Sequence, residues 1–194
     1  RILKIKKLLK ENNIDGYIIP KNDAYFSEYS SPDRLKIISN FDGSAGFAII
    51  LKKENFLFVD GRYTIQAKIQ AGKNFKIIEV PKFSIKKIFK KYEKKLFLGF
   101  DPELFTKSTI KKFQNNCNLL PISDNFIDKI YKIKKKNSIK PFYNLSYKVT
   151  GEKTELKINR LIKIIKSKNI DNIFISAPEN VAWLLNLRGK DLPY

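Results

Sequence analysis

The residue best suited to hold a ligand is Arg62, in the segment Asp60-Gly61-Arg62-Tyr63. Its guanidinium is planar and permanently charged, and it can bind a carboxylate through two parallel hydrogen bonds. The apolar run 56–59 predicts a strand that ends just before Asp60. Strand ends in open α/β sheets are favoured positions for ligands, so a binding role is one interpretation. The other is a local ion pair with Asp60 or Asp42, and the residues alone favour that pair.

A glycine-rich segment, Phe41-Asp42-Gly43-Ser44-Ala45-Gly46, precedes the apolar run 47–51. Such segments can cradle a phosphate, but a P-loop would carry Gly-Lys-Ser/Thr and open a helix. Here the next element reads as a strand. We therefore expect a tight turn that feeds a hairpin, with Asp42 capping backbone N–H groups. A supporting role for Asp42 beside a substrate is the second interpretation.

A third segment, Asp23-Ala24-Tyr25-Phe26-Ser27-Glu28-Tyr29, combines acids with aromatic side chains. Tyr25 and Tyr29 can line a substrate entrance or pack on the sheet, and the residues alone do not decide between the two. Asp23 is also a suitable N-cap for a helix.

The chain contains no His, and its single Cys is Cys117. His is the usual general base near pH 7 and a frequent metal ligand. Its absence removes the most common side chain for acid–base catalysis and for a transition-metal site. Cys117 has no His to activate it and no second Cys to pair with, which fits a reducing compartment. The acids are dispersed, with no spacing that singles out a metal pair. We therefore predict no catalytic residue and no bound metal in these 194 residues.

The net charge is +20, and nearly all the positive charge is Lys. A strongly basic chain can bind nucleic acid or an anionic surface. Here the lysines are scattered along amphipathic faces, so we favour solvated helix faces over a nucleic-acid partner. No stretch reaches the ~18 apolar residues that a membrane helix needs, so we expect no membrane partner.

Strand and helix patterns alternate along the first 131 residues, which predicts an α/β domain on a mixed sheet covered by helices. Runs 46–51 and 56–59 are joined by a short polar turn and predict an antiparallel hairpin. The other expected strands are 17–19, 75–80, 96–100 and 117–121. The expected helices are an N-terminal one that ends near Asn12-Asn13 and those over 63–71, 83–92, 108–115 and 126–131. Residues 137–151 show no clear period and read as an extended connection.

After this connection the pattern of the first residues recurs. Asn13-Ile14-Asp15 matches Asn169-Ile170-Asp171, 156 positions later, and Asn40-Phe41-Asp42-Gly43 is echoed by Asn186-Leu187-Arg188-Gly189. A helix, an Asn-Ile-Asp turn, a strand and an Asn-x-x-Gly turn thus occur twice. We expect a first domain over 1–134, a linker over 135–152 and the beginning of a second, similar domain over 153–194.

The chain resembles the N-terminal domain of the Xaa-Pro aminopeptidases (aminopeptidase P), in the creatinase and prolidase superfamily. The resemblance rests on the three segments above and on Asn180-Val181-Ala182-Trp183-Leu184-Leu185-Asn186-Leu187-Arg188-Gly189. It implies a creatinase N-terminal-like (ribonuclease H-like) domain, followed by the truncated second copy found in the three-domain cytosolic type. The family often has His where Tyr25 stands. Its catalytic "pita-bread" domain, which binds two divalent ions, usually Mn, through two Asp, one His and two Glu, is expected to be absent from this chain.

The resemblance implies an N-terminal fragment of a cytoplasmic metallopeptidase that acts on peptides with Pro in second position. This part would shape the substrate cleft and be inactive alone. Arg62 would bind the peptide, with Tyr25 and Asp42 as further candidates. Its partners would be the peptide, its own catalytic domain and, for the full-length protein, a second copy.

Two alternatives remain. One is a non-catalytic, aminopeptidase-like binding module of the histone-chaperone kind, for which the charge of +20 would favour acidic partners or nucleic acid. The other is a creatinase or prolidase relative that acts on another C–N bond, which the duplicated N-terminal pattern disfavours.

Overall fold

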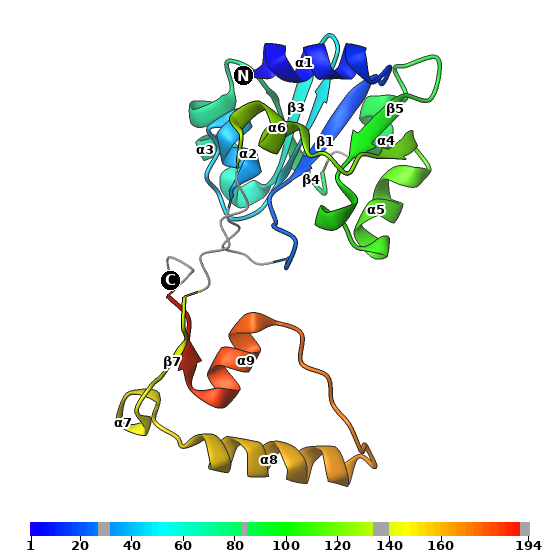
Figure 1. The fold of residues 1–194 in the computed structure, drawn as a ribbon. Coiled ribbons are helices and arrows are strands. Elements are labelled where there is room, and N and C mark those ends of the chain that lie inside the picture. The colour runs from blue at the N-terminus through cyan, green and yellow to red at the C-terminus, as the bar shows by residue number, and fades with distance from the viewer. Residues whose placement is uncertain (27–31, 83–84, 134–139, 191–194) are drawn as a thin grey trace. The chain divides into compact units, whose positions relative to one another are not determined.

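A six-stranded mixed sheet organises the first part of the chain in the computed structural model (Figure 1). The structure describes residues 1–26, 32–82, 85–133 and 140–190. The chain divides into two units, unit 1 over residues 1–135 and unit 2 over residues 136–194.

The strand order in unit 1 is β4-β3-β2-β1-β5-β6. The strands are β1 (Gly16–Pro20), β2 (Phe47–Leu51), β3 (Asn55–Asp60), β4 (Lys76–Val80), β5 (Phe97–Phe100) and β6 (Asn118–Pro121). Strand β2 runs antiparallel to both β1 and β3, and the other neighbouring pairs are parallel. The mixed α/β sheet and the β2–β3 hairpin confirm two predictions from the sequence.

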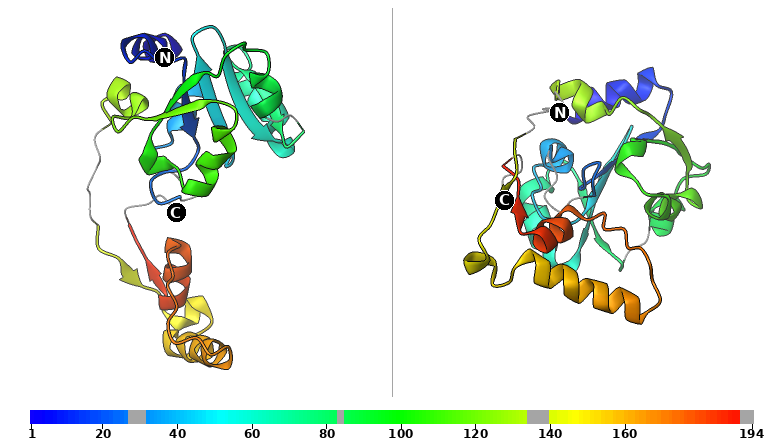
Figure 2. Two further views of the ribbon diagram at one scale, coloured as in Figure 1. Left: turned by 90° about the vertical axis from the view of Figure 1, so that its right-hand side faces the viewer. Right: turned by 60° about the horizontal axis from the view of Figure 1, so that its bottom comes forward.

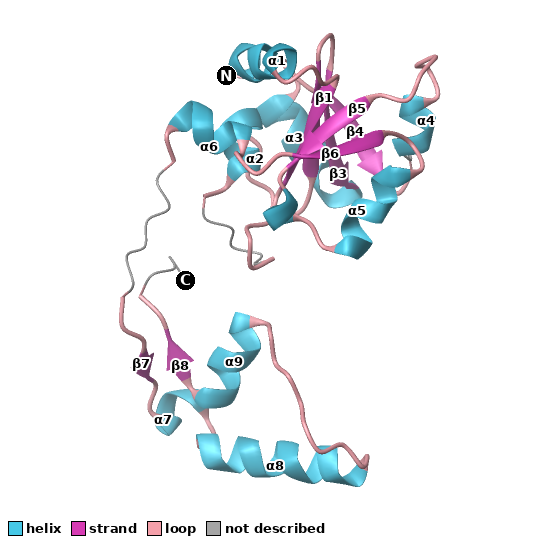
Figure 3. Ribbon diagram, turned by 45° about the vertical axis from the view of Figure 1, so that its right-hand side comes forward, coloured by secondary structure: helices cyan, strands magenta, loops and turns pink. Residues whose placement is uncertain are grey.

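Helices cover both faces of this sheet, as Figure 3 shows with the strands in magenta. They are α1 (Ile2–Glu11), α2 (Arg34–Ser39), α3 (Thr64–Ala71), α4 (Ile85–Phe89), α5 (Lys107–Gln114) and α6 (Phe126–Tyr131), with 3-10 turns η1 (Gly61–Tyr63) and η2 (Pro102–Leu104). One face packs against residues of α1, α2, α3 and α6, and the other against residues of α4 and α5. Figure 2 shows the two layers from other directions.

The alternation of side chains along each strand explains why both faces are apolar. In β1, Tyr17 and Ile19 lie in the first core and Ile18 lies in the second, and all are at most 1% exposed. The strand therefore reads as a continuous apolar run, which is typical of a sheet buried on both sides.

Helix α2 is an element that the sequence did not predict. It spans only six residues, too few to display a helical period, although its ends carry clear signals. Asp33 caps it by accepting from the backbone N–H of Lys36 (3.0 Å), and Asn40 ends it in the left-handed conformation (φ 66°).

Unit 2 consists of β7 (Tyr143–Asn144), α7 (Tyr147–Thr150), α8 (Thr154–Ser167), α9 (Pro178–Leu185) and β8 (Leu187–Arg188). Residues 137–151 were expected to be an extended connection, whereas the described part of this range contains β7 and α7. The pairing of β7 with β8 is a long-range contact, and α7 is a single turn capped by Ser146. Neither feature produces a periodic pattern in the sequence.

The same local contacts occur in both units. The guanidinium of Arg1 donates to the carbonyl of Ile37 (3.0 Å) and to Oδ1 of Asn40 (2.5 Å). In unit 2, Nζ of Lys157 donates to the carbonyl of Trp183 (2.8 Å) and to Oδ1 of Asn186 (2.7 Å). Each Asn is the left-handed residue that ends a helix. We call this arrangement the basic–Asn clamp.

Candidate functional site

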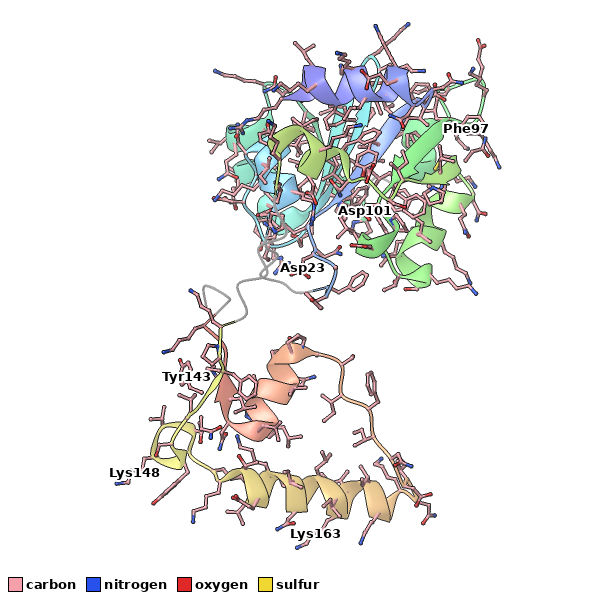
Figure 4. All side chains as sticks on the ribbon, viewed as in Figure 1. Asp23, Phe97, Asp101, Tyr143, Lys148 and Lys163 are labelled. Atoms are coloured by element: carbon pink, nitrogen blue, oxygen red, sulfur yellow. The ribbon has the colours of Figure 1, made fainter. Side chains whose placement is uncertain are left out.

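The described residues of the three segments singled out above lie at one edge of the unit 1 sheet. All strands except β2 run the same way, so the ends of β1 and β3 and the loop that enters β2 meet at this edge. Tyr25 follows β1, Asp42 precedes β2 and Arg62 follows β3. We call this the carboxyl edge. Figure 4 labels Asp23 and Asp101, which follow β1 and β5 there.

Arg62 lies in η1, directly after β3, and forms a bidentate ion pair with Asp60. Its Nε donates to Oδ1 of Asp60 at 3.1 Å and its Nη2 donates to Oδ2 at 2.7 Å. The backbone N–H of Arg62 also donates to Asp60, at 2.9 Å. These hydrogen bonds hold the pKa of Asp60 below its ordinary value. The local ion pair weighed in the sequence analysis therefore forms.

The Arg62 guanidinium nevertheless faces solvent. Its side chain is 73% exposed, and it lies over the ring of Tyr63 at 5.2 Å. The ion pair with Asp60 fixes its direction without covering it. An exposed pair of this kind is worth little in stability, and the exposed guanidinium remains accessible to a carboxylate ligand.

The glycine-rich loop packs against η1. The hydroxyl groups of Ser44 and Tyr63 lie 2.7 Å apart, and the rings of Phe41 and Tyr63 meet edge to face at 5.8 Å. Gly46 adopts a φ of 151°, and a Cβ there would meet the carbonyl oxygen of Phe58 at 2.8 Å. The loop and the turn that carries Arg62 therefore form one packed structure.

Asp42 connects this loop to α3. Its Oδ1 accepts from Nε2 of Gln66 (2.8 Å) and of Gln70 (2.7 Å), and Lys36 Nζ lies 3.5 Å from Oδ2. These contacts, that of Gln70 first, lower the pKa of Asp42. The sequence predicted that Asp42 would cap backbone N–H groups, whereas the recorded partners of its carboxylate are side chains. Gln66 and Gln70 lie one helical turn apart on α3, so both side-chain amides reach the same carboxylate oxygen of Asp42 and take the place of the expected backbone donors.

Tyr25 lies at the same edge but on the other side of β2 from Arg62. Its side chain is 81% exposed, so it does not pack on the sheet. Its backbone N–H donates to Oδ1 of Asp23 at 2.9 Å, and residues 24–25 form a turn where Asp23 was considered as a helix N-cap. Tyr29 lies outside the described residues.

A buried polar network that the sequence analysis did not find supports the carboxyl edge. Arg34, 8% exposed, donates from Nε and Nη2 to the two carboxylate oxygens of Asp128, both at 2.7 Å. Burial opposes the charge of Arg34, but these contacts outweigh it and raise its pKa. The partners are 94 residues apart, so no local pattern could have paired them.

The same network reaches the loop that carries Tyr25. Asn125 donates to Oδ2 of Asp101 at 2.8 Å, and Asp101 caps η2. Asn22 then donates to the carbonyl of Leu104, in η2, at 2.9 Å. The loop after β1 is thus tied to β5 and α6.

Within the described ranges, no group of three or more His, Cys, Asp or Glu side chains could hold a metal ion. Cys117 is buried, and burial raises the pKa of its thiol to about 11, so it stays protonated near neutral pH. In the same ranges no helix is long and apolar enough to cross a bilayer. The exposed Arg62 guanidinium gives the carboxyl edge a group that can bind an anion, whereas the described residues form no cluster of metal ligands.

Comparison with known proteins gives two consecutive family matches. Residues 1–130 match a model described as the creatinase/prolidase N-terminal domain, and residues 133–194 match a second model with the same description. The protein described as "Probable Xaa-Pro aminopeptidase P" from Pyricularia oryzae is 33% identical over all of this chain, which covers 34% of it. Its counterpart from Paracoccidioides brasiliensis (strain Pb03) is 34% identical, again over all of this chain and 33% of the relative. The chain spans about a third of the length of these relatives.

Among solved structures, the X-prolyl aminopeptidase from Caenorhabditis elegans is similar to all of this chain. The TM-score is 0.78, the identity is 27%, and 35% of that chain is covered. It is described as a cytosolic enzyme with a di-nuclear active site. The N-terminal domain of the peptidase PepQ from Mycobacterium tuberculosis shares the fold (TM-score 0.53, 20% identity) over 66% of this chain and 96% of that domain.

Proposed function

Because this chain belongs to the creatinase/prolidase N-terminal domain family, we propose that it is the N-terminal part of an Xaa-Pro aminopeptidase. Such an enzyme releases the first residue of a peptide whose second residue is Pro. The observation that carries this proposal is the match of both units, in order and over the whole chain, to Xaa-Pro aminopeptidase relatives.

The bond-breaking step belongs to a part of the protein outside these 194 residues. The proposed enzyme would use two divalent ions, Mn in our proposal, which would activate water and stabilise the developing charge. The described residues do not fit such a centre, since they form no cluster of metal ligands and the chain has no His. The C. elegans neighbour, with its di-nuclear site, supports placing the metals elsewhere in the protein.

The role proposed for this chain is to hold and orient the peptide. Arg62 would bind a carboxylate of the substrate through its guanidinium, with Asp60 holding that group in place until the ligand arrives. Asp42 would support the site by holding the glycine-rich loop against α3, and Tyr25 would line the entrance through which the substrate reaches the site. Positioning of this kind lowers the barrier by fixing the reacting geometry.

Residues 153–194 would begin a second domain of the same type, joined to a first domain (1–134) by 135–152. The recurrence of the basic–Asn clamp supports this, because Lys157 contacts Trp183 and Asn186 as Arg1 contacts Ile37 and Asn40. The full-length protein would be cytoplasmic and would pair with a second copy through the remaining part. The description of the C. elegans neighbour as cytosolic supports that location.

The proposal is tested by assaying the full-length protein on tripeptides that carry Pro or Ala in second position. We expect cleavage of the Pro peptides only, loss of activity in a metal chelator, and recovery when Mn²⁺ is added. The chain 1–194 alone should be inactive. A full-length protein that cleaves neither peptide, with metal present, would contradict the proposal.

A second candidate function is non-catalytic binding of an acidic partner, favoured by the net charge of +20. It predicts an inactive full-length protein that binds acidic ligands with a steep dependence on salt. The same assay, repeated with a salt titration of binding, therefore separates the two functions.

A further inference from the structure

A recess opens in unit 1 at the edge of the sheet opposite to the carboxyl edge, where β5 and β6 begin. Its volume is about 230 Å³. It is lined by two residues of α4, by the chain that leads from α4 into β5 and by two residues after α5: Lys86, Phe89, Lys90, Tyr92, Glu93, Lys94, Lys95, Leu96, Asn115 and Asn116. Figure 4 labels Phe97, which follows Leu96, far from Asp23 of the carboxyl edge.

The recess is strongly basic. Four of its lining residues are Lys, at positions 86, 90, 94 and 95, and one is acidic, Glu93. Among the described residues, no ion pair engages these four lysines. These four lysines are exposed and all border one recess, unlike the lysines of α1, which are spread along a helix face.

Two further carboxylates that contact this part of the chain, Glu54 and Asp15, already accept other donors. Glu54 accepts from Lys76 (2.8 Å), from Lys91 and from the hydroxyl of Tyr92. Burial alone would raise the pKa of Glu54, but these partners outweigh it and bring the pKa to about 2. Asp15 accepts from Lys52 and from the backbone N–H of Phe97, both at 3.0 Å. Both carboxylates are thus held by other partners, and of the four lysines only Lys94 interacts with Asp15 through its charge.

The floor of the recess is apolar. Phe89 is 6% exposed and Leu96 is 8% exposed, and both belong to the core on this face of the sheet. A low-dielectric wall beside a cluster of like charges strengthens the field inside a recess. The lining also includes two amide side chains, of which Asn116 donates to the carbonyl of Lys112 at 3.3 Å and Asn115 can offer a neutral donor.

We infer that this recess binds a small, multiply charged phosphate-type anion. Lysine suits such a ligand because its ammonium acts as a compact point charge on phosphate oxygens. The volume is smaller than the ~300 Å³ at which pockets for drug-sized ligands begin, so it fits a phosphate or diphosphate group better than a whole nucleotide. The site is independent of Arg62 and of the peptidase proposal, since it lies at the other edge of the sheet.

Binding is tested on the 194-residue chain by calorimetric titration with inorganic diphosphate at 150 mM salt, where long-range attraction is largely screened. The test variant is K90Q/K94Q. The control is K4Q/K10Q, two exposed lysines of α1, which lowers the net charge by the same amount. A parallel titration with ADP distinguishes a free diphosphate from the diphosphate of a nucleotide.

We expect one saturable site in the parent chain, and a Kd that rises about tenfold or more in K90Q/K94Q and less than twofold in the control, because charge-assisted contacts are lost only in the first. Binding of ADP with a similar Kd would assign the site to the phosphate groups alone. No saturable binding of diphosphate, or an equal loss in both variants, would overturn the inference. Thermal unfolding of each variant without ligand checks that both remain folded.

Discussion

At the scale of the residue, the ion pair between Arg34 and Asp128 illustrates how this chain uses buried charge. It joins α2 to α6, and both partners are largely removed from solvent. Leaving one such charge without its partner is costly, whereas the intact pair contributes little. The carboxyl edge depends on this pair because α6 also carries the Asn125 contact to Asp101.

Replacement of Asp128 by Ala should therefore destabilise unit 1 more than its exposure suggests. We expect a loss of about 2–4 kcal/mol in the free energy of unfolding, since the Arg34 charge would stay buried and unpaired. Urea denaturation followed by far-UV circular dichroism measures this. Asp124→Ala, an exposed neighbour, is the control. A change below 0.5 kcal/mol for Asp128→Ala would show that water solvates the Arg34 charge in the variant, which would contradict this prediction.

Glu54 should make the stability of unit 1 dependent on acid pH. Its pKa is about 2 in the folded chain and about 4.5 when unperturbed. A group with a depressed folded pKa contributes stability that is complete above the unfolded value and lost as the pH falls toward the folded value. We expect the melting temperature to fall between pH 4.5 and pH 2, and this slope to become shallower in Glu54→Gln. Equal slopes in both proteins would contradict this.

At the scale of the element, the basic–Asn clamp connects the start of α1 to the end of α2 in unit 1, and α8 to the end of α9 in unit 2. In unit 2 the clamp residue Lys157 is 3% exposed, and its ammonium also lies over the Trp183 ring at 4.3 Å. Its polar partners are a carbonyl and an amide, so the charge is stabilised by oriented dipoles and by the ring. The clamp thus links α8 to the C-terminal end of α9.

Lys157→Ala should loosen α9 from α8 while unit 1 stays folded. Trp183 is the only Trp in the chain, so its fluorescence reports on unit 2 alone. We expect a red shift of its emission and an earlier urea transition, by about 1–3 kcal/mol, because two hydrogen bonds and a cation–π contact are lost. Lys163→Ala, on the exposed side of α8, should leave the emission unchanged (Figure 4). Identical spectra for the two variants would exclude a role for the clamp.

At the scale of the whole molecule, the two units differ in how much of their apolar surface is covered. Ile18 of β1 is fully buried, whereas Phe174, 156 positions later, is 90% exposed, and Ile173 is 52% exposed. Unit 1 covers its strand with neighbouring strands and helices. In the proposed full-length enzyme, a second sheet would cover the corresponding segment of unit 2.

Phe174→Ser should therefore change the free energy of unfolding differently in the chain 1–194 and in the full-length protein. In the chain 1–194 we expect a change within about 0.5 kcal/mol, as for other exposed positions. In the full-length protein we expect a loss of about 3 kcal/mol or more, as for a large core side chain. Thermal or urea unfolding of the parent and the Phe174→Ser variant, in the chain 1–194 and in the full-length protein, measures both changes. A full-length protein that tolerates Ser at this position would contradict the proposed second domain.

Local patterns predicted most of unit 1. The β2–β3 hairpin, the strand before Arg62 and the helix after it are each specified by neighbouring residues, and so is the ion pair of Arg62 with Asp60. The sequence could not reveal contacts between distant residues, such as Arg34 with Asp128 or β7 with β8. It also missed α2, since six residues do not establish a period. The prediction of backbone partners for Asp42 was wrong as well, because Gln66 and Gln70 lie 24 and 28 residues away in the sequence.

We propose that the exposed Arg62 guanidinium holds a substrate carboxylate, and the kinetics of the full-length protein on short Xaa-Pro peptides can show whether it does. We predict that Arg62→Ala raises KM about tenfold or more with a smaller change in kcat, and that Arg62→Lys restores only part of the loss. Arg160→Ala, which breaks a similar exposed pair with Glu152, should leave both constants unchanged. Unchanged KM and kcat in Arg62→Ala would contradict the account.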